Sequence, residues 1–287
     1  MTLRRRLDLR GRGLAALNYS AAELRDVDSL ELRGNPLGAV PEVLRELYRL
    51  RDLSLSQSGL TDVPDWLWSL TNLETLNLSE NRLTRMPDAI GNLNRLRMLD
   101  LGHNQLNDLP DGLGQLVGLS DFLYLSHNRL SRVPDFFGRF IKLKYLNVTD
   151  NDLGELSGAV GDMASLRELR LYGNQLRWLP ASIGKLTNLR ELHLSNNALE
   201  SLPEQIGDLT SLRILDLRNN QLAGIPGGVG RLENLGYLDL RANRLAQLPD
   251  SIADLPRLEK LDLRWNALDP IPSWVGDLEQ RGCAVLL

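Results

Sequence analysis

The sequence predicts an α/β solenoid, in which one concave sheet of parallel strands is backed by short helical or 3-10 segments on the convex side. Two observations predict it. A 23-residue repeat recurs along the chain, and leucines alternate with polar residues near the start of each repeat. Alternation with a period of two residues is typical of a strand with one buried face. A repeat with one strand and one short helix cannot bury its own apolar face, so the repeats must stack on one another.

The repeats account for nearly all of the 287 residues. Eleven full repeats begin at Val27, Leu50, Leu73, Leu96, Leu119, Leu143, Leu166, Leu189, Leu212, Leu235 and Leu258. A partial repeat precedes them, with Leu7, Leu9, Leu14 and Leu17 in register. We therefore expect an N-terminal partial repeat and cap over 1–26, eleven repeats over 27–280 and a C-terminal cap over 281–287, with no linker or second domain.

An asparagine follows the paired leucines of most repeats. Its amide, as at Asn81, can satisfy backbone groups that the turn out of the strand would otherwise leave buried. Stacked repeats would then form an asparagine ladder, which Arg12 and Ser58 interrupt. Ten of the eleven repeats also carry a proline such as Pro87, which suits the first turn of a short helix. A later glycine such as Gly91 permits close packing.

Both ends of the stack carry sequence signals for caps. Ser20 and Glu23 have the spacing of a capping box, which predicts a helix in the partial repeat. At the other end, a helical segment around Trp274 is predicted to stop at Gly282, and the last residues could add a short strand that covers the final edge. We expect Cys283 to be a buried or terminal thiol, because no base lies beside it to make it a nucleophile.

The pattern L-x-x-L-x-L-x-x-N-x-L-x-x-L-P-x-x-I-G-x-L-x-x resembles the leucine-rich repeats of the intracellular, Ras-related class, which also occur in bacterial proteins. The resemblance covers roughly Leu7 to Leu278. It implies a right-handed horseshoe whose concave face binds a protein. We therefore expect a non-catalytic interaction module or scaffold, not an enzyme. The alternative is the recognition domain of an effector or signalling enzyme whose catalytic module lies on another chain or was truncated.

Composition limits the partners and the setting. The net charge of -4 gives no global basic field for nucleic acid. No apolar run approaches the ~18 residues of a membrane span, and the N-terminus shows no secretory signal. The single cysteine excludes an internal disulfide. We expect a cytoplasmic monomer, or a protein delivered into a host cytosol if it is a bacterial effector, with a protein partner and without a cofactor, nucleic acid or membrane.

Two polar columns are predicted on the concave face. The column between the paired leucines includes Asp8, Glu31, Asp216, Asp239 and Asp262, and the column two residues later includes Arg10, Arg33, Arg218, Arg241 and Arg264. One interpretation is an internal charge ladder, in which each column offsets repulsion within the other. The other is a charged docking strip for a partner, and both can hold.

Aromatic side chains, which are only 5% of the chain, concentrate at outward strand positions of consecutive central repeats. Such a cluster is typical of an interface hot spot, although the rings could also simply pack on one another. A thinner patch follows toward the C-terminus, and the three histidines are predicted on the same face. The predicted partner-binding residues are Met98, His103, Phe122, Tyr124, His127, Tyr145, Tyr172, His193, Tyr237 and Trp265.

The repeat at Leu119 carries one extra residue, which predicts a bulge in its strand. Phe137 and Phe140 of this repeat fall on core positions, whereas Phe122 and Tyr124 fall on exposed ones.

A metal site is a further hypothesis for the same face. Glu80, His103, His127 and Asp150 follow one another in one column at ~5 Å steps, which could bind a divalent metal or respond to pH. Ladder spacing is too regular for metal geometry, so polar surface or partner contact is favoured and no metal is expected. His193 lies several strands away, so these residues form no Ser-His-Asp arrangement.

Overall fold

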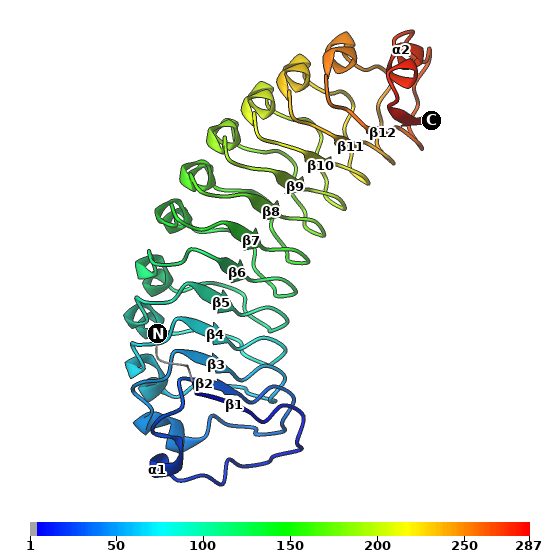
Figure 1. Ribbon diagram of the computed structural model, residues 1–287. Coiled ribbons are helices and arrows are strands. Elements are labelled where there is room, and N and C mark those ends of the chain that lie inside the picture. The colour runs from blue at the N-terminus through cyan, green and yellow to red at the C-terminus, as the bar shows by residue number, and fades with distance from the viewer. Residues whose placement is uncertain (1–4) are drawn as a thin grey trace. The chain divides into compact units, whose positions relative to one another are not determined.

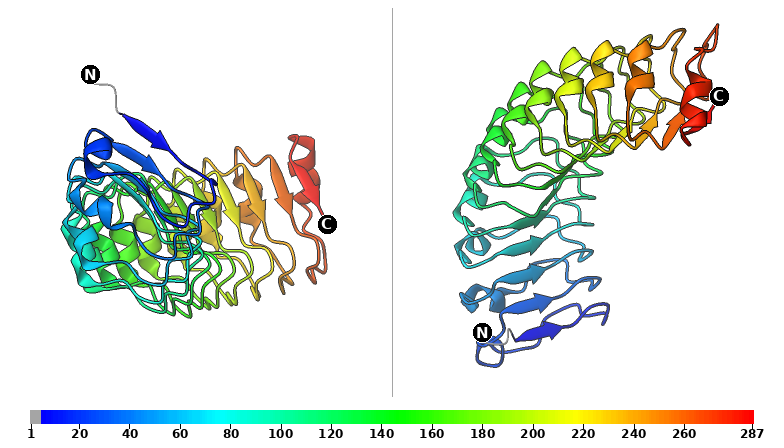
Figure 2. Two further views of the ribbon diagram at one scale, coloured as in Figure 1. Left: turned by 90° about the horizontal axis from the view of Figure 1, so that it is seen from below. Right: turned by 45° about the horizontal axis from the view of Figure 1, so that its top comes forward.

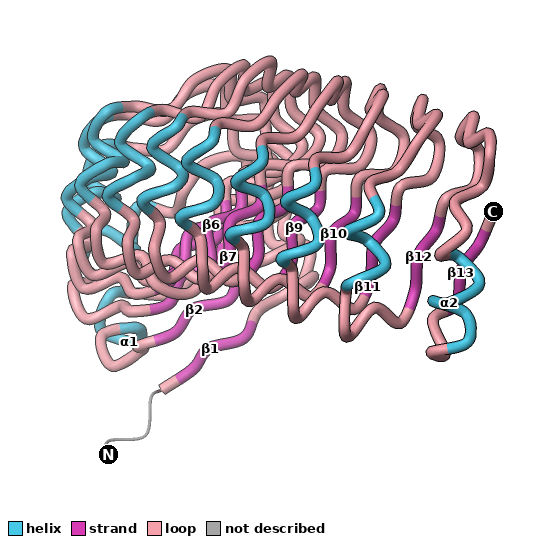
Figure 3. The backbone as a smooth tube through the Cα atoms, turned by 90° about the horizontal axis from the view of Figure 1, so that it is seen from above, coloured by secondary structure: helices cyan, strands magenta, loops and turns pink. Residues whose placement is uncertain are grey.

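The computed structural model describes residues 5–287, which form two compact bodies. We call them the N-terminal body, which ends at Leu130, and the C-terminal body, Ser131–Leu287. In each body the strands lie side by side in sequence order, and the 3-10 helices line the opposite side of the stack (Figure 1). The same two layers are visible from other directions in Figure 2 and in the backbone trace of Figure 3.

The N-terminal body contains the strands β1 (Arg6–Asp8), β2 (Ser29–Glu31), β3 (Asp52–Ser54), β4 (Thr75–Asn77), β5 (Met98–Asp100) and β6 (Phe122–Tyr124). Its helices are α1 (Ala21–Leu24) and the 3-10 helices η1 (Glu42–Glu46), η2 (Asp65–Ser69), η3 (Asp88–Asn92) and η4 (Asp111–Gln115). Each strand pairs in parallel with the next, one repeat further along the chain. The predicted solenoid fold is confirmed.

The C-terminal body continues the pattern with β7 (Tyr145–Asn147), β8 (Glu168–Arg170), β9 (Glu191–His193), β10 (Ile214–Asp216), β11 (Tyr237–Asp239), β12 (Lys260–Asp262) and β13 (Ala284–Leu286). Its helices are the 3-10 helices η5 (Asp135–Arg139), η6 (Gly158–Asp162), η7 (Ala181–Lys185), η8 (Glu204–Asp208), η9 (Gly227–Arg231) and η10 (Asp250–Asp254), and α2 (Val275–Gln280). Among the described residues, no helix is both long enough and apolar enough to cross a bilayer.

The asparagine ladder is present, and each of its asparagines links its repeat to the one before it. The Asn81 amide donates to the carbonyls of Leu55 and Leu78, both at 2.9 Å, and its oxygen accepts the N–H groups of Ser58 and Leu60. Because Asn81 is buried, these bonds satisfy backbone groups that water cannot reach. The same pattern recurs at Asn35, Asn104, Asn128, Asn174, Asn197, Asn220, Asn243 and Asn266.

The prolines occupy a different position from the one predicted. Pro87 is not the first residue of η3 but its N-cap, in extended conformation, and its carbonyl accepts the N–H of Ile90 at 3.1 Å. A residue that precedes the helix needs no N–H for it, and the fixed φ of proline suits this extended backbone. In the one full repeat without the proline, Ser157 caps η6 by accepting the N–H of Ala159 at 3.1 Å.

The extra residue of the Leu119 repeat does not form a bulge within β6, so that prediction is wrong. Phe122 lies opposite Met98 in unbroken register with β5. The N–H groups of Ser120 and Asp121 both donate to the carbonyl of Arg97, immediately before the strand begins. The insertion is therefore absorbed ahead of the strand, which leaves the outward positions of β6 aligned with those of β5.

Both predicted caps are present. Ser20 and Glu23 form a reciprocal capping box at α1. The segment after α2 turns at Gly282, whose φ is 90°, and β13 then pairs in parallel with β12. Cys283 is buried, and this burial raises the pKa of its thiol. The predicted core phenylalanines Phe137 and Phe140 are fully buried.

Candidate partner-binding face

The N-terminal body carries an aromatic cluster on its last two strands. Phe122 and Tyr124 alternate along β6, and their rings stack with centroids 5.7 Å apart. Phe122 is 39% exposed and lies opposite Met98, which is half-buried. Tyr124 lies opposite Asp100, and burial raises the pKa of that carboxyl. We call Met98, Phe122 and Tyr124 the aromatic cluster.

A pair of histidines lies next to the aromatic cluster. His103 and His127 are both exposed, and their rings stack with centroids 4.0 Å apart. Both lie after their strands and not on them, in a turn with φ near +50°. The predicted strand position was wrong for Tyr172, which follows β8.

Two members of the four-residue metal hypothesis lie together, and a third is paired with another side chain. The stacked histidines are adjacent, but the Glu80 carboxylate pairs with Arg33 at 3.1 Å. Among the described residues, the group with a spacing that suits a metal ion is a different one, Glu168, Glu191 and His193.

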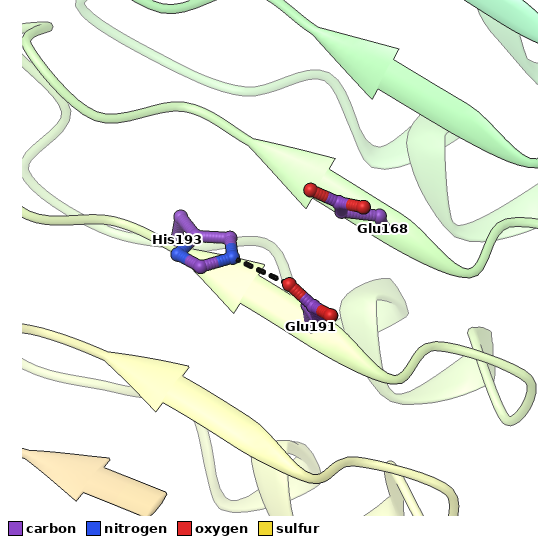
Figure 4. A group of neighbouring side chains, drawn as sticks. All are labelled: Glu168, Glu191 and His193. Carbon is purple, nitrogen blue, oxygen red and sulfur yellow. Dashed lines mark hydrogen bonds and ion pairs between the residues drawn. The ribbon is translucent and has the colours of Figure 1, made fainter.

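This second group lies on two neighbouring strands of the C-terminal body (Figure 4). Its ligand atoms all lie within 4.8 Å of one another. Glu168 and Glu191 are directly opposite in register, an arrangement of like charges that normally destabilises a sheet. Each acid is compensated, because Glu168 accepts from Arg170 at 2.5 Å and Glu191 contacts His193 Nε2 at 3.0 Å. The three side chains that could hold a metal ion thus already have partners within the protein.

Three of the predicted aromatic residues of the C-terminal body contact cations. The Arg170 guanidinium lies over the Tyr145 ring at 5.6 Å, and Lys260 Nζ lies over the Tyr237 ring at 5.2 Å. Arg264 lies over the ring of Trp265, which is 71% exposed. Such contacts hold the ring faces in place and leave the ring edges available.

The two charged columns near the C-terminus neutralise each other, as the charge-ladder interpretation predicts. Asp239 and Asp262 are fully buried beneath the arginines that follow them. Asp239 pairs with Arg241 at 2.6 Å, and Asp262 pairs with Arg264 at 2.7 Å and with Arg241 at 3.3 Å. Each carboxylate also accepts the backbone N–H two residues later, so the column stabilises the chain as it leaves the strand.

All ten predicted partner-binding residues are exposed or half-buried, and they are divided between the two bodies. The N-terminal body brings together the aromatic cluster and the histidine pair. In the C-terminal body, Tyr145 and His193 lie near Arg170 and the two glutamates, and Tyr237 and Trp265 form a separate pair of sites. The exposed Trp178 and Tyr48 were not predicted, because both lie outside the strand columns.

Stacked parallel strands, an asparagine ladder and one short 3-10 helix per repeat define the class of leucine-rich solenoids. The chain belongs to the leucine-rich repeat family. The model described as "Leucine rich repeat" matches residues 25–83, 48–106, 71–130 and 210–268, and that of a leucine-rich repeat region matches residues 123–221. A search of curated protein sequences found no significant match.

Solved structures of similar fold include receptors and bacterial proteins. The plant peptide hormone receptor RGFR1, solved in complex with RGF2, is 28% identical with a TM-score of 0.79, covering 98% of this chain and 49% of that one. An internalin (inlF) from Listeria monocytogenes is 21% identical with a TM-score of 0.80, covering 99% and 86%, and shows the fold alone. A Leptospira interrogans leucine-rich repeat protein is 27% identical with a TM-score of 0.51, covering 99% and 96%. The chain thus spans about half of the plant receptor chain.

Proposed function

We propose that this protein is a non-catalytic interaction module that binds a protein partner on its strand face, at the aromatic cluster. The observation that carries the proposal is the stack of Phe122 and Tyr124, which places two large rings on one exposed strand. Aromatic side chains are enriched at interface hot spots, because they bury a large area and lose little conformational entropy. The stacked His103 and His127 extend the same surface with groups that donate or accept hydrogen bonds.

The class of protein supports the proposal. RGFR1 was solved in complex with RGF2, and another similar structure, 25% identical, is an assembly of FLRT2 with Latrophilin 3 and Unc5D. Leucine-rich repeat proteins are generally binding modules and not catalysts. Much of the C-terminal strand face is self-neutralised, since its aspartates lie buried beneath arginines. Because these carboxylates are already paired within the protein, we assign the contact to the aromatic cluster.

The test is affinity capture with wild-type protein and with the double variant Phe122→Ala/Tyr124→Ala. We expect the variant to lose the partner that wild type recovers, because truncating two hot-spot rings weakens binding by roughly a hundredfold. Both side chains lie on the exposed face, so thermal stability should stay close to wild type.

The matched control is Tyr48→Ala/Val117→Ala. These residues are 59% and 50% exposed and belong to the same body, but they lie outside its strands. The control variant should recover the partner as wild type does. If both variants recover the partner equally, the proposed site is wrong.

A further inference from the structure

The position immediately before each strand is charged in many repeats. In the N-terminal body its sign alternates from repeat to repeat. Arg51 pairs with Glu74 at 2.9 Å, and Arg97 pairs with Asp121 at 3.0 Å. Each pair joins neighbouring repeats, so this column is neutralised within the protein.

The same column does not alternate in the C-terminal body, where it reads Lys144, Arg167, Arg190, Arg213. All four side chains are exposed. The Arg190 N–H donates to the Arg167 carbonyl at 2.7 Å, and the Arg213 N–H donates to the Arg190 carbonyl at 2.8 Å, which keeps the residues in step. We call Arg167, Arg190 and Arg213 the arginine column.

The guanidinium groups of the arginine column make no ion pair or hydrogen bond with any residue that the structure describes. The nearest acids along the strands are already engaged, since Glu168 pairs with Arg170 and Glu191 contacts His193. Neighbouring strands lie ~4.8 Å apart, so three unpaired like charges stand close together and repel one another. An anionic partner would relieve that repulsion.

The arginine column ends at a hollow of about 720 Å³. Arg213 lines this hollow together with Arg257 and Lys260, and Glu259 is the carboxylate in its lining. In the repeat after Arg213 the column position is occupied by Gly236, which has no side chain to fill the space. The hollow is therefore cationic and open at the end of the column.

We propose that the arginine column binds an acidic, extended segment of a protein partner, with one acidic side chain of that segment in the hollow. This inference rests on the proposed binding function and assigns a second contact surface to it. A single row of arginines suits a narrow peptide. The chain as a whole carries a charge of -4, which disfavours the broad phosphate contacts of a nucleic acid.

The experiment measures fluorescence anisotropy of a labelled oligo-glutamate peptide with the full chain. Arg167→Gln/Arg190→Gln should weaken binding roughly fivefold to tenfold, because two charge pairs are lost. The matched control is Arg51→Gln/Arg97→Gln, which removes the same charge from the same column position where the arginines are already paired. The control should stay within about twofold of wild type, since its arginines do not face the peptide.

Equal weakening in both variants would show an effect of net charge alone, and no weakening in either would show that the column does not bind; both overturn the inference. Tighter binding of a single-stranded oligonucleotide than of the peptide, with the same arginine dependence, would overturn the choice of partner. Phe122→Ala/Tyr124→Ala should bind the peptide as wild type does. Failure of the peptide assay while partner capture still depends on Phe122 and Tyr124 would therefore overturn this inference alone.

Discussion

At the scale of single residues, the strand column of aspartates and asparagines serves the backbone as much as the surface. Asp262 accepts the N–H of Arg264 and pairs with two guanidinium groups while fully buried. Burial alone would raise its pKa, but the hydrogen bonds from Arg264 and the charge of Arg241 outweigh burial and lower the pKa below its ordinary value.

This lowered pKa makes stability depend on acid. A carboxyl group with a depressed folded-state pKa stabilises the fold above its unfolded pKa of about 3.9, and the contribution is lost as the pH falls through the folded value. We therefore expect Asp262→Asn to be less stable at pH 7 by about 1–2 kcal/mol, because Arg264 is partly exposed and the pair is only half desolvated. The difference from wild type should shrink below pH about 4.

Urea unfolding across pH measures this effect. The control is Asp254→Asn, an exposed carboxylate in a neighbouring repeat that has no side-chain partner in the described part of the chain. It should change stability by less than about 0.5 kcal/mol at any pH. If the difference in unfolding free energy between Asp262→Asn and wild type persists unchanged in strong acid, the charge of Asp262 is not the cause of that difference.

The columns of outward-facing side chains were predictable from the repeat, because alternation with a period of two residues fixes which side chains share a face. The left-handed turn at His103 and His127 was missed, although histidine is among the residues enriched at positive φ. The sequence did carry a signal for this turn, because glycine occupies the same position in other repeats. Gly34 and Gly173 at that position also have positive φ. The arginine column could also be found in the sequence, but only the structure shows that its side chains lack partners among residues 5–287.

At the scale of elements, the 3-10 helices depend on a glycine that touches the next repeat. A Cβ at Gly207 would lie 2.0 Å from the carbonyl oxygen of Gly228, and one at Gly161 would lie 2.3 Å from that of Ser182. Backbone atoms cannot move aside as a flexible side chain can. The close packing predicted from the repeat glycines is therefore confirmed.

Gly207→Ala should destabilise the protein by about 2 kcal/mol, because the added methyl group overpacks the contact between η8 and η9. Gly154→Ala is the matched control in the same body, since its Cβ would meet nothing within 4 Å. The control should be as stable as wild type or slightly more stable, since alanine restricts the unfolded chain. Equal urea midpoints for the two variants would contradict the packing account.

The order and type of the elements were predictable, since each repeat carries its own strand, turn and helix signals. The position of the extra residue in the Leu119 repeat was not predictable, because a count of residues cannot show whether that residue lies within a strand or before it. The unbroken register of β6 with β5, together with the hydrogen bonds of Ser120 and Asp121 to Arg97, settles that point.

At the scale of the whole molecule, the need of the repeats to stack predicted the solenoid fold but not its division into two bodies. The division falls between Leu130 and Ser131, inside the repeat that carries the insertion. The repeat pattern runs through this point, so the sequence shows no linker there.

The most direct test of strand-face binding places a photo-cross-linking amino acid at Tyr124 in one protein and at Tyr48 in another. Both positions are tyrosines of the same body, and only Tyr124 lies on a strand. We predict that irradiation in cells of the native host gives a specific protein cross-link from position 124 and none from position 48. A partner cross-linked from position 48 but not from position 124 would contradict binding at the aromatic cluster.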